Sequence, residues 1–216
     1  RRHCAMEIAV RPASTAQQRF VIDDGSKVGE ARRAAQKLAT LVFNEELAGK
    51  VAIAATELAN NLLLHAGGGE LLMQTLDSGD EAIVELLALD KGPGMDVAEC
   101  MRDGYSTGGT PGTGLGAVRR LASEFDIHSR PGEGTAILAR FGTPPAVRYG
   151  AVSVAVEGEI DCGDAWHIVS DAEGTAVIVV DGLGHGTFAA EAARVAVDAF
   201  ADSPFSAPGE FMTRAH

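Results

Sequence analysis

The chain has 216 residues, of which 46% are hydrophobic and 22% charged, a composition typical of a folded globular protein with a buried core. Its 30 acidic and 18 basic residues give a net charge of -12, which disfavours non-specific binding to nucleic acid or to an anionic membrane surface. No apolar run is long enough to span a membrane. Three widely spaced cysteines with no CxxC pair predict neither a disulfide framework nor a zinc site, and favour a reducing cytoplasm.

The first part of the chain predicts one strand and then two helices. Arg19–Ile22 has the pattern of a short strand. Ser26 is a predicted N-cap for a helix that runs to about Phe43, and Asn44 is a predicted N-cap for a longer helix that runs to about His65. Apolar residues at helical spacing define the buried faces of these helices. The expected face residues are Val28, Ala31, Ala35, Leu38 and Val42 in the first, and Leu47, Val51, Ala54, Leu58 and Leu62 in the second.

The middle of the chain predicts two hairpins with a glycine-rich segment and a helix between them. Runs at 70–76 and 82–89 flank "DSGD" and predict the first hairpin. The glycine-rich segment then leads into a helix at 115–124. Runs at 126–129 and 135–141 flank "RPGEG" and predict the second hairpin.

A change of composition at residues 142–149 predicts a linker between a domain at 19–141 and a second region at 150–216. The second region has strand-like patterns at 152–156 and 166–169, and a buried strand that ends at Asp181. It also has a helical pattern at 186–200, and another helix begins near Pro208. No internal repeat is present.

Three motifs in the first domain carry polar side chains that could form one site. In "TELANNLLLH", Glu57, Asn61 and His65 are spaced four apart, so they share one helical face. A carboxylate and an amide there can orient a hydroxyl group and hold Mg²⁺, which needs few protein oxygens. A polar, solvent-exposed helical face is the alternative, and His65 could equally serve core packing.

The second motif, "LLALDKGPGM", places Asp90 at the end of an apolar strand. A carboxylate at this position can accept a hydrogen bond from the amino group of a purine. Gly92 and Gly94 allow the chain to turn beneath the base without a Cβ clash. The alternative is a plain turn with a capping aspartate.

The third motif, "STGGTPGTGLG", is glycine-rich and precedes a helix. Backbone N–H groups at a helix N-terminus, with the positive end of its dipole, form a ready phosphate site. The segment does not open a βαβ unit, and no Gly-Lys-Ser/Thr ends it, so neither a Rossmann motif nor a P-loop is indicated. Its glycines are Gly108, Gly109, Gly112, Gly114 and Gly116.

The ordered motifs "ELANNLLLH", "DKGPGM", "GTGLG" and "PGEGT" resemble the N-box, the G1 box, the lid with G2 box, and the final glycine–threonine motif of the GHKL ATPase superfamily. The likeness covers about Phe20 to Phe141. It is closest to the switch-type serine kinases that act on anti-sigma and stressosome proteins, the RsbT-like kinases. The resemblance implies an α/β fold of the GHKL (Bergerat) type, a two-layer α+β sandwich with a largely antiparallel sheet and helices on one face.

The resemblance also implies roles for individual residues. Glu57 matches the general base or a residue beside it, and Asn61 matches the Mg²⁺-binding amide. Lys91 and Arg119 could reach phosphates, although most basic side chains are merely solvated. The full set of ATP-binding residues implied is Asn61, Asp90, Gly92, Gly94, Gly108, Gly112, Thr113, Gly114, Leu115, Gly116 and Thr135. The implied cofactors are ATP and Mg²⁺, and the implied partner is a STAS-domain antagonist or scaffold. Homodimer formation stays open.

The second region contains "EIDCGDAW" and "VIVVDGLGHG". A carboxylate at a strand end beside open backbone carbonyls provides hard oxygen ligands for Mg²⁺ or Mn²⁺. The alternative is a tight strand-to-helix turn. The pair resembles the start of metal-dependent PP2C-type phosphatases of the SpoIIE and RsbX kind, which implies metal binding by Asp164, Asp181 and the carbonyl of Gly182. His185 lies in the same turn, where we expect a surface position.

The region after Gly150 is shorter than a full phosphatase domain, so phosphatase activity is not expected of this chain alone. Three functions therefore remain open. The first is a protein kinase fused to part of a phosphatase. The second is a nucleotide-dependent binding module without phosphotransfer. The third is a phosphatase, within a longer protein, that its ATP domain regulates.

Overall fold

The structure, a computed structural model, describes residues 8–12, 17–78, 81–97, 114–144, 147–172 and 174–215. The chain divides into two compact units. One unit consists of Gln18–Thr75 and Ile83–Pro144, and we call it the nucleotide unit after the ATP-binding role that the resemblance implies. The C-terminal unit consists of Arg1–Gln17, Leu76–Ala82 and Pro145–His216. Within the described residues, none of the helices is sufficiently long and apolar to cross a membrane.

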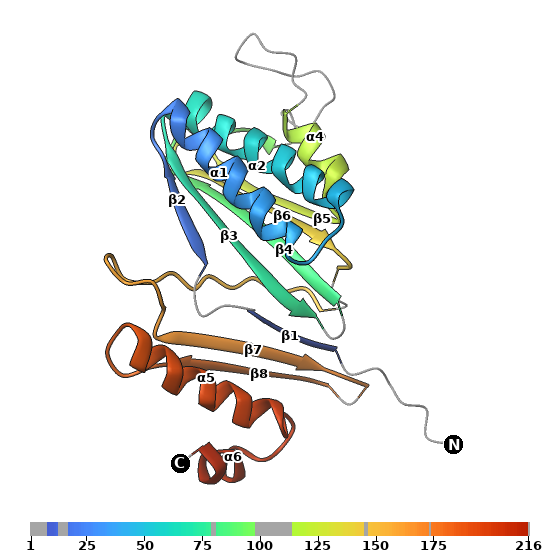
Figure 1. The fold of residues 1–216 in the computed structure, drawn as a ribbon, viewed down its shortest axis with the longest axis vertical. Coiled ribbons are helices and arrows are strands. Elements are labelled where there is room, and N and C mark those ends of the chain that lie inside the picture. Colours follow the sequence, from blue (N-terminus) through green and yellow to red (C-terminus); the bar gives the residue numbers. More distant parts are fainter. Residues whose placement is uncertain are drawn as a thin grey trace. The chain divides into compact units, whose positions relative to one another are not determined.

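The nucleotide unit is built on a sheet with helices on one face (Figure 1). The strand order is β5-β6-β4-β3, and β2 pairs with β3. The pairs whose register is described are antiparallel, which confirms the predicted two-layer architecture. The strands are β2 (Gln18–Ile22), β3 (Gly69–Ser78), β4 (Glu81–Asp90), β5 (Glu124–Arg130) and β6 (Gly134–Gly142).

Three described helices belong to this unit: α1 (Gly25–Thr40), α2 (Glu45–Ala66) and α4 (Gly114–Leu121). Asn44 caps α2 as predicted, because its side chain accepts a hydrogen bond from the N–H of Leu47 at 2.9 Å. The predicted cap of α1 is wrong. Asp24 is the N-cap, and Ser26 is the residue whose N–H donates to the Asp24 carboxylate at 2.6 Å.

The core of the nucleotide unit lies between the helices and the sheet. The predicted apolar faces of both helices are largely buried, including Leu38 in α1 and Leu58 in α2. Val42 is an exception, because α1 ends at Thr40 and leaves Val42 38% exposed. The predicted helix at 115–124 is also shorter than expected, since Glu124 already belongs to β5.

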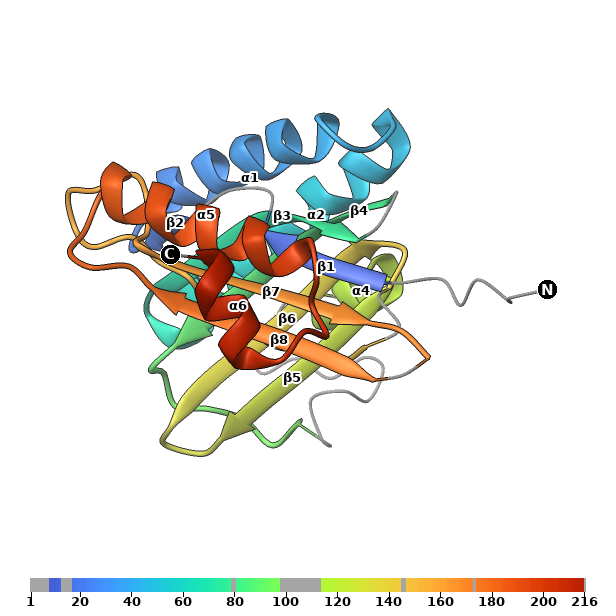
Figure 2. The same ribbon diagram turned by 90° about the horizontal axis from the view of Figure 1, so that it is seen from below.

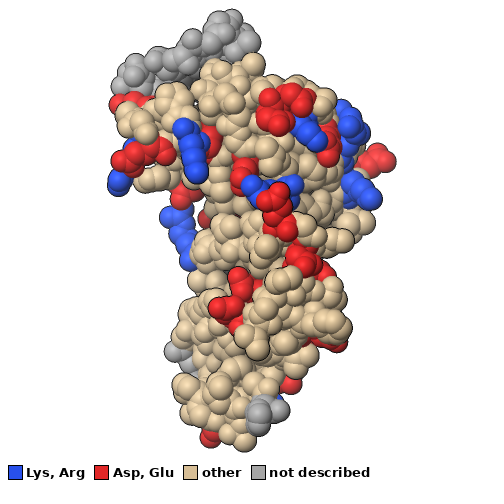
Figure 3. Space-filling view, turned by 90° about the vertical axis from the view of Figure 1, so that its left-hand side faces the viewer, with Lys and Arg blue, Asp and Glu red and all other residues tan. Residues whose placement is uncertain are grey.

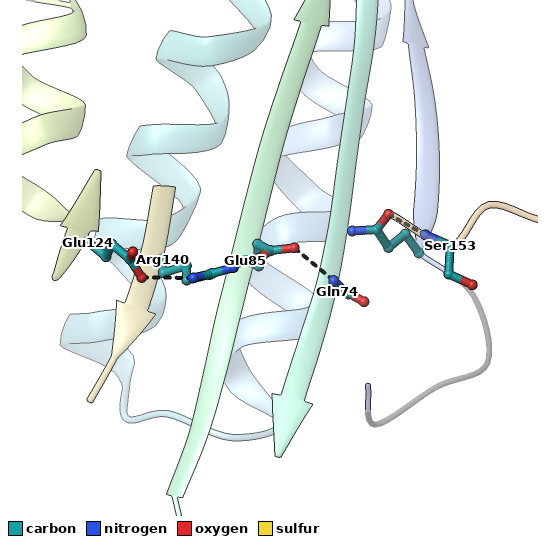
Figure 4. A network of polar contacts seen from close by, with 6 residues as sticks. Gln74, Glu85, Glu124, Arg140 and Ser153 are labelled. Carbon is teal, nitrogen blue, oxygen red and sulfur yellow. Dashed lines mark hydrogen bonds and ion pairs between the residues drawn. The ribbon is translucent and has the colours of Figure 1, made fainter. Parts of the chain in front are cut away.

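A row of polar side chains crosses the sheet of the nucleotide unit (Figure 4). Arg140 is fully buried between two carboxylates, with N···O distances of 2.7 Å to Glu85 and 2.9 Å to Glu124. Glu85 also accepts a hydrogen bond from the Gln74 amide at 2.7 Å. Glu85 and Glu124 both face Arg140 in the strand register, so each ion pair joins neighbouring strands.

The C-terminal unit contains a second set of antiparallel strands, in which β7 (Asp164–Ser170) pairs with β1 (Ile8–Pro12) and β8 (Thr175–Asp181). The helix α5 (Thr187–Ala201) packs on β7 and β8, and α6 (Pro208–Ala215) follows it (Figure 2). The helices confirm the predicted segments. The strand β1 was not predicted.

Two predictions for the C-terminal unit are wrong. Residues 152–156 are not a strand, because the N–H of Ser153 binds the Gln17 side chain at 3.2 Å and does not continue a backbone ladder. Figure 4 shows this contact. The strand that ends at Asp181 is not buried, since Val177 and Val179 are 58% and 77% exposed. The helix α5 covers the opposite face of this strand pair, where His167 meets Phe200.

On the face shown in Figure 3, the lower part of the view has few charged side chains, mostly acidic, and most charged side chains lie over the upper part. Acidic and basic groups are interspersed there, and the described residues on this face form no continuous basic surface. Acidic residues are most in excess in the segment 145–216, which contains eleven Asp or Glu and three Lys or Arg. Most of the net negative charge therefore belongs to the C-terminal part of the chain.

Candidate functional site

Glu57 and Asn61 lie one turn apart on α2 and face the start of α4. A Cβ atom placed on Gly114 would lie 3.0 Å from Glu57 Oε2 and 3.7 Å from Asn61 Oδ1. The first residue of the helix after the glycine-rich segment is thus in van der Waals range of both predicted side chains. This places a carboxylate, an amide and a helix N-terminus together, the groups that a magnesium-bound phosphate requires.

The side-chain amide of Asn61 has a hydrogen-bond donor that no described residue accepts. Its Nδ2 atom is buried and has no hydrogen-bond partner among them. A buried amide without a partner is costly, and such groups occur where a ligand or water completes the site. The pairing of this orphaned amide with the Glu57 carboxylate fits an oxygen-ligated Mg²⁺ together with a phosphate.

The other basic and polar residues considered for the phosphate end are exposed. His65 lies at the solvent-exposed end of α2, so core packing, the alternative considered for this residue, is wrong. Lys91 and Arg119 are also exposed, and the described residues show no contact that would direct either one to the site.

The residues predicted to bind the base of the nucleotide lie where β4 and β6 meet, and we call this part of the candidate site the base end. Asp90 and Thr135 are directly opposed in the strand register, so their side chains point to the same face of the sheet. Asp90 Oδ1 accepts the N–H of Gly92 at 2.8 Å. The capping turn considered as an alternative is therefore present, and it leaves the second carboxylate oxygen available.

Two glycines bring the turns at the base end close together. Gly94 has a φ of +66°, and a Cβ at this position would collide with the carbonyl of Arg130. Gly134 has a φ of +91°, and a Cβ there would collide with the carbonyl of Asp90. Both positions therefore require glycine for conformation as well as for space. The loop after β4 and the β5–β6 turn are packed directly against each other.

Part of the predicted lid lies outside the described residues. This concerns Gly108, Gly109, Gly112 and Thr113. The residues that follow them, Gly114, Leu115 and Gly116, form the first turn of α4.

Two residues at the base end were missed by the sequence analysis. Ser129 has its hydroxyl within hydrogen-bond distance of Met95, Gly134 and Thr135. Ala66, the last residue of α2, lies against Gly92. A hydroxyl-bearing residue just before the "RPGEG" turn was a signal for the first, whereas no local pattern marks the second.

The C-terminal unit brings together the three residues of the second predicted constellation. Asp164 and Asp181 are directly opposed at one end of the β7–β8 pair. The N–H of Gly182 donates to the carbonyl of Gly163 at 3.1 Å, which holds the following turn beside them. The described residues contain no group of three or more His, Cys, Asp or Glu side chains able to hold a metal. His185 is exposed as expected, with Nδ1 2.7 Å from Glu159 Oε1.

Comparison with known proteins gives matches to the part of the chain that forms the nucleotide unit. Residues 23–141 match the family described as the histidine kinase-like ATPase domain. The chain is also similar to the serine/threonine-protein kinase RsbT of Bacillus subtilis (strain 168), with 42% identity over 92 residues, 42% of this chain and 68% of RsbT.

Two solved structures are similar at low scores. The mycobacterial sensor histidine kinase MprB gives a TM-score of 0.38 at 15% identity and covers 60% of this chain and 99% of that one. The histidine kinase domain of the Erythrobacter litoralis EL346 blue-light activated kinase gives a TM-score of 0.36 at 18% identity, with 54% and 59% covered. TM-scores this low carry no structural argument.

Proposed function

The chain belongs to the histidine kinase-like ATPase domain family, and from this premise we propose that it is an ATP- and Mg²⁺-dependent protein serine/threonine kinase. Its substrate in this proposal is a STAS-domain regulator of a sigma factor or stress response. The position of Gly114 beside Glu57 and Asn61 is the observation that carries the proposal. It brings the end of the glycine-rich segment to the two side chains to which the proposal assigns roles in phosphoryl transfer.

The nucleotide would occupy the space between the two ends of the site. Asp90 would accept a hydrogen bond from the amino group of the base, beside Thr135. Asn61 would hold the metal through Oδ1, and the N–H groups at the start of α4 would face the phosphates. Bound Mg²⁺ would neutralise negative charge on the phosphate oxygens.

Glu57 would act on the substrate hydroxyl. It is half-buried on α2, and the described residues offer its carboxylate no hydrogen bond or ion pair. As the serine or threonine oxygen attacks the γ-phosphorus, the hydroxyl proton passes to Glu57 and the bond to the ADP oxygen breaks. Positioning and charge stabilisation supply most of the acceleration in such reactions, and a general base adds about 10²–10⁴-fold.

The similarity to RsbT supports a protein substrate in place of a small molecule. The chain aligns with 68% of that kinase over 92 residues, a segment shorter than the nucleotide unit. The choice of a STAS-domain protein rests on the resemblance to switch kinases of this type.

The decisive experiment compares phosphotransfer and nucleotide binding in the same variants. Purified protein with Mg²⁺ and labelled ATP should transfer phosphate to a STAS-domain protein encoded near it. Glu57→Gln should lower the transfer rate by about 100-fold or more, while the ATP affinity changes by less than about threefold. Glu46→Gln is the matched control, because Glu46 lies on the same helix and pairs with Lys50 at the surface.

The outcomes separate the kinase from the alternative binding module. If ATP binds but no STAS-domain protein is phosphorylated, the kinase proposal is wrong and a nucleotide-dependent binding function replaces it. If Glu57→Gln transfers phosphate as well as Glu46→Gln does, Glu57 is not the base.

A second proposal concerns the C-terminal unit, where a specific observation favours a divalent cation. Like charges directly opposite in a sheet are destabilising, and Asp164 and Asp181 are directly opposed in the strand register. We propose that this unit is part of a PP2C-type phosphatase module and holds Mg²⁺ or Mn²⁺ with help from the Gly182 carbonyl. Calorimetric Mn²⁺ titration of the whole chain should show binding that Asp181→Asn abolishes and the control Asp171→Asn retains. Equal binding by both variants would contradict it.

A further inference from the structure

The Ser129 hydroxyl connects three segments at the base end of the site. It lies 2.9 Å from the N–H of Met95, in the loop after β4. It lies 3.0 Å from the carbonyl of Gly134 and 2.9 Å from the hydroxyl of Thr135, both at the start of β6. Ser129 itself lies near the end of β5 and is paired with Thr135 in the strand register. One side chain therefore contacts the loop and strand that flank Asp90.

Counting donors and acceptors fixes the direction of these hydrogen bonds. A serine hydroxyl has one proton to donate and two lone pairs that accept. Met95 supplies a donor and the Gly134 carbonyl can only accept, so Ser129 accepts from the first and donates to the second. The remaining lone pair of Ser129 then accepts the proton of Thr135.

This arrangement determines what Thr135 can offer to a ligand. Its only proton is directed to Ser129, so the remaining capacity of its hydroxyl is that of an acceptor. Thr135 is directly opposite Asp90, whose carboxylate is also an acceptor. Asp90 and Thr135, the two groups proposed to face the base, would thus both require a donor, such as an amino group, and both would disfavour a carbonyl.

We propose that Ser129 is a positioning residue that sets the selectivity of the site for a base with an amino group over one with a carbonyl. It does so by orienting the Thr135 hydroxyl as an acceptor. Its bond to Met95 also holds the glycine-containing loop, which supports the affinity for either base without changing the preference. The proposal rests on the nucleotide-binding function proposed above. It adds the residue that makes the Thr135 hydroxyl at the base end a hydrogen-bond acceptor.

The loop contact has independent support from the backbone. The N–H of Gly132 donates to the carbonyl of Pro93 at 2.7 Å, so the loop after β4 and the β5–β6 turn already share a backbone bond. Ser129 adds the side-chain bond two residues further along the loop. Loss of the hydroxyl should therefore loosen the loop without separating the two segments.

The test measures the affinity of the whole chain for ATP and for inosine triphosphate, both with Mg²⁺, in matched variants. Inosine triphosphate carries a carbonyl where ATP carries the amino group. Ser129→Ala should weaken ATP binding about three- to tenfold, the effect of one lost hydrogen bond, and lower the ATP preference by a similar factor. Without Ser129, the Thr135 hydroxyl can rotate and donate to the carbonyl of inosine.

Two further variants separate a positioning role from a merely structural one. Ser129→Thr keeps the hydroxyl and should restore the ATP preference. Ser123→Ala is the matched control, because Ser123 is also a serine of the β5–β6 hairpin region and donates to the Arg140 carbonyl. It should leave both affinities unchanged.

A double-mutant comparison keeps the proposal testable even if Ser129→Ala lowers the melting temperature. Thr135→Val should lower the ATP preference to the same extent, and adding Ser129→Ala to Thr135→Val should lower it no further. Additive losses of preference would overturn the proposal, as would a Ser129→Ala preference equal to that of the wild type.

The variant Asp90→Asn distinguishes failure of this proposal from failure of the proposed nucleotide site. If Asp90→Asn weakens ATP binding more than about tenfold while Ser129→Ala leaves the preference unchanged, the site is right and the role of Ser129 is wrong. If Asp90→Asn leaves ATP affinity unchanged, the base site itself is wrong.

Discussion

The nucleotide unit and the C-terminal unit use similar hydrophobic strands but bury them to different extents. The main core cluster of buried residues lies entirely within residues 22–141, where helices cover the sheet. Of the fifteen large hydrophobic side chains that are exposed among the described residues, ten lie between Val152 and Met212. The β8 run "AVIVV" is at least as apolar as the β4 run "AIVELLAL", yet Val177 and Val179 are exposed. Strand hydrophobicity alone therefore does not determine burial, because a covering layer is also needed.

The largest expected effect comes from breaking the buried charge row of the nucleotide unit. Arg140→Met should destabilise folding by about 3–5 kcal/mol, because it leaves the carboxylates of Glu85 and Glu124 without their buried partner. Arg130→Met is the control, since the exposed Arg130–Glu133 pair at 3.6 Å should contribute only about 0–1 kcal/mol. Urea denaturation measures the loss of unfolding free energy in both variants. Equal losses would show that Arg140 and its two carboxylates are solvated.

Core truncation tests the contrast in burial between the two units directly. Leu58→Ala, at a fully buried position on α2, should cost about 2–5 kcal/mol. Phe188→Ala, at an 88% exposed position on α5, should change the free energy of unfolding by less than about 0.5 kcal/mol. If Phe188→Ala lowers the free energy of unfolding by several kcal/mol, the Phe188 side chain is buried in solution. The contrast in burial between the two units would then be wrong.

The helix caps give a smaller contrast. The helix α2 begins with a side-chain cap, whereas α5 begins at Gly186 with no side-chain cap. Asn44→Ala should destabilise the nucleotide unit by about 1 kcal/mol, since the N–H of Leu47 loses its acceptor. Gln36→Ala, at an exposed position within α1, should have an effect of less than about 0.5 kcal/mol. Thermal or urea unfolding measures the stability of both variants. Equal stabilities would contradict the role of Asn44 as a stabilising cap.

The smallest effect is a pH dependence at the start of α1. Hydrogen bonding to the Ser26 side chain, and then to its N–H, lowers the pKa of the Asp24 carboxyl below its usual value. The folded state therefore binds the proton less readily than the unfolded state, and the stabilisation present above about pH 4 is lost as the pH falls through the folded pKa.

This pH dependence is measured as the slope of melting temperature against pH between about pH 5 and pH 3. Asp24→Asn should reduce the slope, and Ser26→Ala should reduce it partly because it removes the largest cause of the shift. An unchanged slope in Asp24→Asn would contradict the assignment of Asp24 as a charged cap.

Local patterns predicted the helices and the order of the motifs. The Asn44 cap, the buried face of α2 and the placement of Glu57 and Asn61 all depend on residues within a few turns of one another, and the structure agrees with each. The start of α1 shows the limit of such patterns. Asp24 and Ser26 are both good caps by residue type, and only the backbone geometry selects Asp24.

Features that depend on distant pairings were not predictable. The strand β1 contains a proline and pairs with segments far along the chain, so its own residues give a weak signal. Ser129 becomes important only when the loop after β4 lies against the β5–β6 turn. Arg140 and Glu85 each interrupt an apolar run, which was a usable signal for a buried ion pair, although the sequence does not state which acid faces which base.

The close contact between Gly92 and Ala66 lets positions along α2 define distances within the proposed nucleotide site. A Cβ on Gly92 would lie 2.7 Å from the Ala66 Cβ, so the loop that we propose to bind the base rests against the last residue of that helix. Asn61 and Glu57 stand five and nine residues earlier, roughly 8 and 14 Å along the helix axis at 1.5 Å per residue. In the proposed site, this one stiff helix would set the separation between the groups that bind the base and the groups that act on the phosphates. A nucleotide with a shortened phosphate chain would engage the base end while leaving the Glu57 end empty.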